Sequence, residues 1–347
     1  MLRRKLILIS IALLFSTLAC RAATRLIIPD TPTPVPPTPT PIPPTPTPFP
    51  TATFTPTPIP EASCPVITSD ILDTAIYYDF NEEDDPGEEI YLASYFVTGD
   101  ELRGPFKETV PDKYKDERDD RDAHEEIWEY FTRLIPPEQR DFLTAFSIVT
   151  DGNGNILAAV AQSTSDSKEW VLEVDILDST NKQVLTVTLL HEFAHLLTLN
   201  STQVPPSEAI FENPNSDRIY QEEFDACLNY FPGEGCSNTD SYVNQFFNRF
   251  WLDLYDEWQE IDSEDDEDTY YDLLDDFYST YEDQFLTEYA VTSPAEDIAE
   301  SFAFFVLSPR IEPKSIADEK IMFFYEFPEL VELRGKILEQ LCTEFPQ

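Results

Sequence analysis

Two histidines and a glutamate stand at the spacing that a catalytic zinc site requires. They form the pattern His191-Glu192-x-x-His195 within the apolar run 184–199. Residues four apart lie on one face of an α-helix, so His191 and His195 can direct ring nitrogens at one metal ion. Glu192 stands beside them and can accept a proton from water that zinc activates for attack on a carbonyl group. The pattern therefore predicts zinc-dependent hydrolysis.

Histidine is rare in this chain, which argues against a chance occurrence of the motif. The chain has three histidines, and two of them belong to it. The alternative interpretation, two histidines that only pack in a core helix, requires the spacing to be accidental. The third, His124, lies in a charged stretch and is predicted to be a surface residue, with a place in the cleft as the alternative.

A catalytic zinc ion needs a third protein ligand as well as an open position. No histidine follows His195. Thr198 and Ser201 also occupy the positions where the extended metzincin motif has glycine and histidine. The third ligand must therefore be an acid.

Glu296 is the best candidate for this ligand, at the start of the apolar segment 294–307. Glu300 lies four residues on, so one acid can bind the metal while the other hydrogen-bonds a ligating histidine. The competing explanation is a capping box, because Ser293 precedes Glu296 by three residues and Pro294 occupies the first helical position. Capping alone leaves Glu300 among apolar residues without a partner.

The segment from Tyr289 to Phe302 resembles the second zinc motif of the anthrax lethal factor family of gluzincin peptidases. That family has a glutamate ligand, a second acid four residues on, and an active-site tyrosine seven residues before the ligand. The resemblance implies Glu296 as the ligand, Glu300 as the acid supporting a ligating histidine, and Tyr289 as the tyrosine on the oxyanion side.

The chain departs from this family in the 100 residues between His195 and Glu296, a longer interval than gluzincins usually have. The departure implies a helical, acidic insertion at about 212–285. It also leaves Glu222 and Glu223 as rival ligands.

Three β-strands are predicted before the histidine-bearing helix. Segments 145–150 and 155–161 are apolar and flank Asp151-Gly-Asn-Gly154, which predicts a hairpin. Segment 170–176 alternates with period two, and at a sheet edge it could pair with an extended peptide.

Helices are predicted before the motif, over the motif itself and after it. They cover residues 125–134, 184–199, 241–261, 269–281, 294–307 and 315–341, the last with a break near Pro328. The acidic run 262–276 lacks the glycine of an EF-hand loop, so a solvated helix face or linker is favoured over calcium binding.

The N-terminal 19 residues are predicted to be a signal peptide. Three basic residues precede an apolar run that is too short for a permanent membrane anchor. A small residue before Cys20 is typical of a bacterial lipobox, although Thr17 departs from it. Cys20 is therefore predicted to be lipidated, and an ordinary cleaved signal peptide is the alternative.

Residues 20–62 are predicted to be a stalk behind this lipid. The stretch 31–60 holds 14 prolines and no charged residue, a composition that favours extended polyproline II. Such a layout is similar to that of bacterial lipoproteins described as zinc-binding peptidases. It predicts attachment to the outer face of the membrane at the bacterial cell surface.

Four further cysteines suggest two disulfides in an exported chain. Cys227 and Cys236 bracket a Pro-Gly turn stretch and are predicted to pair, which leaves Cys64 with Cys342.

The formal net charge is −45, which excludes nucleic acid as a natural partner because both surfaces are anionic. The chain is expected to act on a peptide or protein, as a monomer.

We expect an α+β, zincin-like domain at 63–347, with an upper β-sheet, an active-site helix and a helical lower half. The predicted function is peptide hydrolysis at the cell surface with Zn²⁺ as cofactor and Glu192 as general base. The alternative is a non-catalytic surface binding protein with a structural or vestigial zinc site. An intact Glu192 argues against it, because a structural site has no need of that carboxylate.

Overall fold

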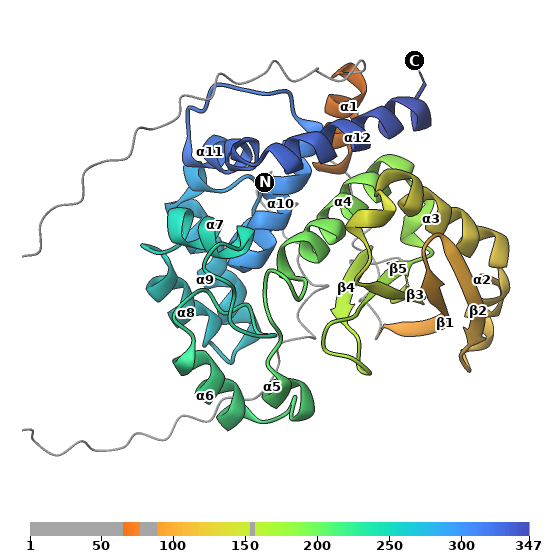
Figure 1. Cartoon of the computed structure of the whole chain (residues 1–347), viewed down its shortest axis with the longest axis horizontal. Helices are drawn as coiled ribbons and strands as arrows, with labels where there is room; N and C mark the ends of the chain where they lie inside the picture. The colour runs from red at the N-terminus through yellow and green to blue at the C-terminus, as the bar shows by residue number, and fades with distance from the viewer. Residues whose placement is uncertain (1–64, 77–88, 153–156, 347) are drawn as a thin grey trace, which may run out of the picture.

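The computed structural model describes residues 65–76, 89–152 and 157–346, and it confirms the predicted α+β class. A five-stranded sheet has the order β2-β1-β3-β5-β4 (Figure 1). The β3 and β5 strands run parallel, and the other neighbours run antiparallel. The strands are β1 (Ile90–Thr98), β2 (Glu101–Lys107), β3 (Leu143–Thr150), β4 (Ala158–Gln162) and β5 (Trp170–Asp175).

The predicted hairpin between segments 145–150 and 155–161 is wrong, because β5 lies between β3 and β4 in the sheet. Five of the six residues of β5 are buried, and strands buried on both faces belong in a sheet interior. Gly152, with a φ of 108°, instead leads the chain away from β3.

The β4 strand forms the sheet edge, so the edge position considered for segment 170–176 is also wrong. The β4 strand is short and mostly half-buried, and it pairs with β5 on one side. Its other side has no strand partner among the residues that the structure describes. An unpaired edge of this kind can accept an extended peptide as a further strand.

Two helices, α3 (Arg121–Leu134) and α4 (Lys182–Leu199), supply apolar side chains that pack with the sheet. The indole of Trp128 lies 5.3 Å from the ring of Phe146 on β3, measured between centroids. Leu172 and Val174 of β5 are fully buried in the same core. The α4 helix, which carries the histidine motif, contributes Leu189, Leu190 and Phe193 to this core and is thereby held against the sheet.

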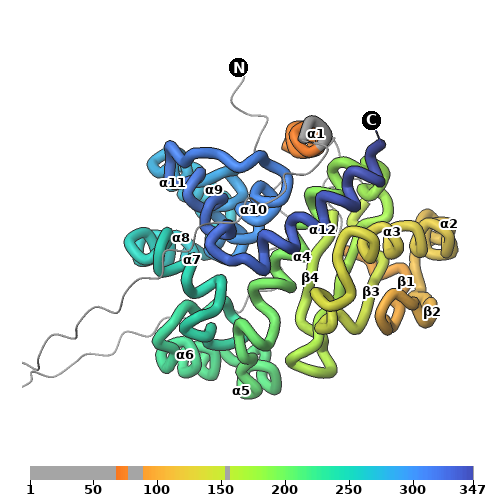
Figure 2. The backbone as a smooth tube through the Cα atoms, turned by 45° about the horizontal axis from the view of Figure 1, so that its top comes forward, coloured from red at the N-terminus to blue at the C-terminus, as the bar shows by residue number. Residues whose placement is uncertain are grey.

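The remainder of the chain is helical and lies mainly on the other side of α4 (Figures 1 and 2). The ring centroids of Phe193 on α4 and Phe302 on α10 are 5.8 Å apart. The predicted break near Pro328 is confirmed, because α12 begins there. The α2 helix (Lys115–Asp119) lies on the sheet side beside α3 (Figure 1). The other helices are α1 (Pro65–Ile76), α5 (Glu208–Glu212), α6 (Asp217–Ala226), α7 (Tyr242–Phe250), α8 (Tyr255–Asp262), α9 (Glu267–Thr280), α10 (Pro294–Leu307), α11 (Ile316–Phe323) and α12 (Pro328–Glu344).

The region 212–285 contains α6 to α9 and the confirmed disulfide between Cys227 and Cys236, whose Cα atoms are 5.4 Å apart. Within the acidic run, Asp266 caps α9 by accepting a hydrogen bond from the Thr269 backbone. The predicted partner of Cys342, Cys64, lies outside the described residues, so that pairing stays a prediction.

The signal peptide, Cys20 and the stalk also lie outside the described residues. None of the described helices is both long and apolar enough to cross a membrane.

His124 is fully buried, so its predicted surface position is wrong. Its Nε2 lies 2.8 Å from the Glu117 carbonyl oxygen, and its Nδ1 lies 2.7 Å from the Tyr95 hydroxyl. A carbonyl oxygen only accepts, so Nε2 carries the proton and Nδ1 accepts from Tyr95. The neutral imidazole thus joins α3 to β1 through Tyr95 and to α2 (Lys115–Asp119) through Glu117.

Acid should destabilise the protein through His124. Burial lowers the pKa of His124 below its ordinary value of 6.5, so the unfolded chain takes up this proton first as the pH falls. The free energy of unfolding should therefore decrease below about pH 6.5, by at most about 1.4 kcal/mol per pH unit. Urea unfolding from pH 7.5 to 5 should show a shallower decrease for His124→Gln. Parallel curves for both proteins would rule this contribution out.

Candidate metal centre

The α4 helix brings the two motif histidines together. Asn181 caps the helix by accepting backbone hydrogen bonds from Gln183 and Val184. From residue 189 to residue 199 every side chain of α4 is buried, so the motif lies inside the molecule. The rings of His191 and His195 lie 4.8 Å apart, measured between centroids, on one face of the helix.

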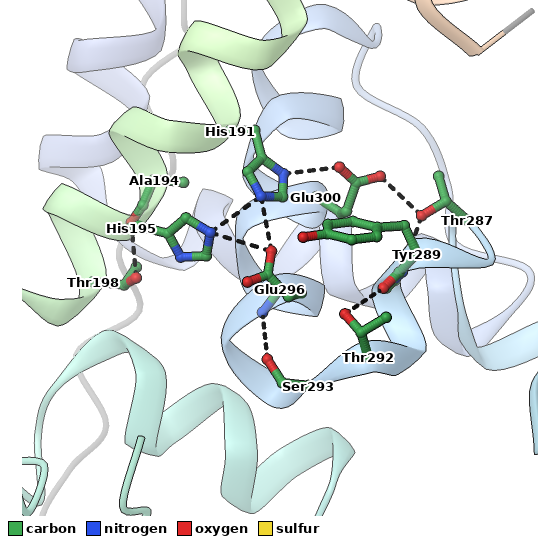
Figure 3. A network of polar contacts seen from close by, with 11 residues as sticks. His191, Ala194, His195, Thr198, Thr287, Tyr289, Thr292, Ser293, Glu296 and Glu300 are labelled. Atoms are coloured by element: carbon green, nitrogen blue, oxygen red, sulfur yellow. Dashed lines mark hydrogen bonds and ion pairs between the residues drawn. The ribbon is translucent and has the colours of Figure 1, made fainter. Parts of the chain in front are cut away.

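The α10 helix supplies the acid that faces them, and the capping-box explanation offered for Glu296 holds only for its backbone. The Ser293 Oγ atom accepts a hydrogen bond from the Glu296 backbone nitrogen at 3.1 Å, which caps α10. The Glu296 side chain does not complete a capping box but points at His191 and His195 (Figure 3). Capping thus uses its backbone and leaves its carboxylate for the histidines.

Three donor atoms converge at this place. The Nε2 atoms of His191 and His195 are 3.1 Å apart, and the Glu296 Oε2 atom lies 2.9 and 3.2 Å from them. Four ligands at 2.0–2.1 Å around a tetrahedral zinc ion lie roughly 3.3 Å from one another. The donor set and its spacing therefore fit a zinc ion with little rearrangement.

Glu300 lies beside His191 and can orient its ring. Its Oε1 atom is 2.8 Å from the His191 Nδ1 atom, and its Oε2 atom accepts a hydrogen bond from Thr287 at 2.8 Å. The contact places the Nδ1 proton toward Glu300 and leaves Nε2 free to bind a metal. Thr287 was missed by sequence reasoning, because no local pattern links it to Glu300.

The carboxylates and histidines of this group shift one another's pKa values, and a metal ion bound there would replace a proton on His191. Burial alone would lower the pKa of His191, but the carboxylates of Glu296 and Glu300 raise it well above its ordinary value. Burial alone would raise the pKa of Glu296, but the two histidines hold it well below its usual range. The buried carboxylate is thus kept ionised, in the form that binds metal.

Glu192 is buried beside the donors, and its Oε2 atom has no hydrogen-bond partner among the described residues. Burial raises its pKa to about 7, although the two histidines and a backbone hydrogen bond from Val160 oppose this rise. Val160 belongs to the edge strand β4. The carboxylate therefore lies between the three donors and the unpaired edge of the sheet.

Tyr289 lies in the 3₁₀ turn Tyr289–Thr292 directly before α10. Its ring centroid is 5.8 Å from that of His191. Its hydroxyl is buried near the Glu296 carboxylate without a hydrogen bond of regular geometry, so it is available to a ligand. The role that the family resemblance implies for Tyr289 stays a prediction.

The rival ligands do not join the site. Glu222 is exposed on α6 and forms an ion pair with Arg218 at 2.6 Å. Glu296 is the acid that gathers with His191 and His195 among the described residues. An acid that sequence reasoning missed is Glu234, in the loop closed by the Cys227–Cys236 disulfide, where burial raises the pKa of its carboxyl.

No family model, no curated protein and no solved structure matches this chain. The lethal factor resemblance therefore depends on the two motifs alone.

Proposed function

We propose that this chain is a zinc-dependent peptidase of the gluzincin type with a zincin-like fold. One observation carries the proposal, namely the convergence of the Nε2 atoms of His191 and His195 with the Glu296 carboxylate beside a buried, unpartnered Glu192. Bound by these three ligands, zinc would lower the pKa of water and polarise the carbonyl group of a substrate.

The side chains around the donors have complementary tasks. Glu192 accepts a proton at its free Oε2 atom from the attacking water and then delivers it to the leaving amine. The buried Tyr289 hydroxyl donates a hydrogen bond to the carbonyl oxygen as that oxygen gains negative charge. Glu300 holds the His191 ring in place.

The substrate we propose is an extended segment of a peptide or protein. Val160 contacts Glu192 from β4, so a chain added to the free edge of β4 passes the proposed base. Main-chain hydrogen bonds to such an edge bind many sequences. A lipid at Cys20 and the stalk would hold this peptidase at the bacterial cell surface, working as a monomer.

The test measures zinc content and peptide hydrolysis on the same purified protein. We expect about one zinc ion per chain, cleavage of unfolded casein, loss of both under a strong chelator, and recovery when zinc is added back. His195→Ala should lose both properties. Stoichiometric zinc without any hydrolysis would favour the alternative, a surface binding protein, whereas absence of zinc would exclude the site.

A further inference from the structure

A buried ion pair adjoins the proposed metal ligand on α10. The Lys320 Nζ atom on α11 lies 2.6 Å from Asp297 Oδ2, and both side chains are fully buried. The indole nitrogen of Trp251, which follows α7, donates a hydrogen bond to the same oxygen at 2.7 Å. Asp297 directly follows Glu296, so three helical segments meet one residue from the site.

Aromatic rings enclose the Lys320 ammonium group. It lies 3.9 Å from the ring centroid of Phe285 and 6.0 Å from those of Phe246, Phe250 and Trp251. Ring faces attract a cation, more strongly where water is excluded. Lys320 is therefore fixed by its surroundings as well as by Asp297.

The α10 helix needs a polar anchor to define its rotation. Ile298, Ala299, Phe302 and Ala303 are at most 1% exposed, so apolar residues cover much of its surface. Its polar side chains lie in the first two turns, where Glu296, Asp297 and Glu300 are each held by a partner on another element. Successive residues of a helix point about 100° apart, so an anchor at Asp297 also fixes the direction of Glu296.

Stability alone does not account for a buried ion pair. Removing two charges from water is costly, and replacing such a pair by well-packed uncharged residues is often neutral or stabilising. An ion pair between α10 and α11 instead fixes how these two helices are oriented relative to each other. The nearest feature that depends on geometry is the Glu296 carboxylate and its contacts to the two histidines.

We propose that Lys320 and Asp297 are positioning residues that set the first turn of α10, so that Glu296 points at the metal. This role rests on the proposed zinc site, and it explains what holds the third ligand, Glu296, in its direction. It assigns to Lys320 a role outside the folding of the core, although this residue touches neither metal nor substrate.

The test compares three proteins with the wild type: Lys320→Met, the uncharged double variant Lys320→Met/Asp297→Asn, and Arg334→Met. Zinc affinity is measured by competition with a chelator, ligand geometry by the visible spectrum of the cobalt-substituted protein, and stability by thermal unfolding without metal. Arg334 is a matched control, because it is buried and donates hydrogen bonds to the Phe305 and Ser308 carbonyl oxygens at the other end of α10.

We expect the double variant to be more stable than Lys320→Met and yet to bind zinc about tenfold more weakly than the wild type, with an altered cobalt spectrum. Arg334→Met should be less stable with unchanged zinc affinity. A double variant with wild-type affinity and spectrum would overturn the positioning role and leave the zinc site intact. A wild type without zinc would overturn the proposed function itself and the positioning role with it.

Discussion

Replacing Glu192 with glutamine should lower peptide turnover about a thousandfold and leave the zinc content unchanged. The amide keeps the shape of the side chain but cannot accept a proton, and general-base catalysis contributes typically ~10² to 10⁴ in rate. Glu192 Oε2 has no hydrogen-bond partner in the described part of the chain, whereas the converging donors belong to His191, His195 and Glu296. Turnover on a quenched fluorescent peptide and zinc content by elemental analysis measure the two effects separately.

Glu173→Gln is the matched control for this substitution. Glu173 is also a buried carboxyl, but it accepts a hydrogen bond from Tyr91 on the sheet and lies outside the donor group. Its replacement should leave turnover within about twofold of the wild type. Near-normal turnover of Glu192→Gln would remove Glu192 from the mechanism, and loss of zinc from that variant would make it a ligand.

Local sequence signals predicted the elements that carry the site. Ser293 with Pro294 before α10 is a start signal that acts within one helical turn, and this cap forms. Helix α4 was predicted at 184–199 from its apolar run, and it begins at Lys182, where Asn181 caps it. The break at Pro328 follows from the missing amide hydrogen of proline. These features depend on neighbours in sequence, so one sequence is enough to find them.

Strand order could not be predicted in the same way. The turn signal at Asp151 to Gly154 is local, but the choice of β5 as the neighbour of β3 depends on burial across the whole sheet. His124 shows the same limit, because its charged neighbours gave no sign of the Tyr95 hydroxyl on β1. A lysine is expected at the surface, and the burial of Lys320 depends on how α10 and the end of α7 pack around it.

The metal ligands were predictable from the sequence only in part. Spacing predicted that His191 and His195 share a face, and that Glu296 and Glu300 do so. Which acid meets which histidine nitrogen depends on how α4 and α10 cross, and here Glu296 faces both Nε2 atoms while Glu300 faces Nδ1. Helical spacing paired Glu296 with Glu300 but left Glu222 and Glu223 as rivals, and the packing of α10 against α4 selects Glu296.

Glu296→Ala should therefore weaken zinc binding more than any other acid replacement in the chain. A ligating carboxylate supplies both a bond and a charge, whereas an acid that orients a histidine typically contributes 10- to 100-fold in affinity. We expect a loss of more than about a hundredfold for Glu296→Ala and of about 10- to 100-fold for Glu300→Ala. Competition with a chromogenic chelator at constant pH measures both.

The helix cap does not affect the comparison of Glu296→Ala with Glu300→Ala. The Ser293 hydroxyl accepts its hydrogen bond from the backbone nitrogen of residue 296, which alanine retains. Loss of a cap alone costs about 0.5 to 2 kcal/mol of stability, so Ser293→Ala should destabilise the protein and keep its zinc. Glu222→Ala and Glu223→Ala are the remaining controls, since Glu222 is exposed and paired with Arg218. A folded Glu296→Ala protein that binds zinc like the wild type, beside a Glu222→Ala or Glu223→Ala protein that does not, would move the third ligand to α6. The lethal factor resemblance would then fail at the residue on which it depends most.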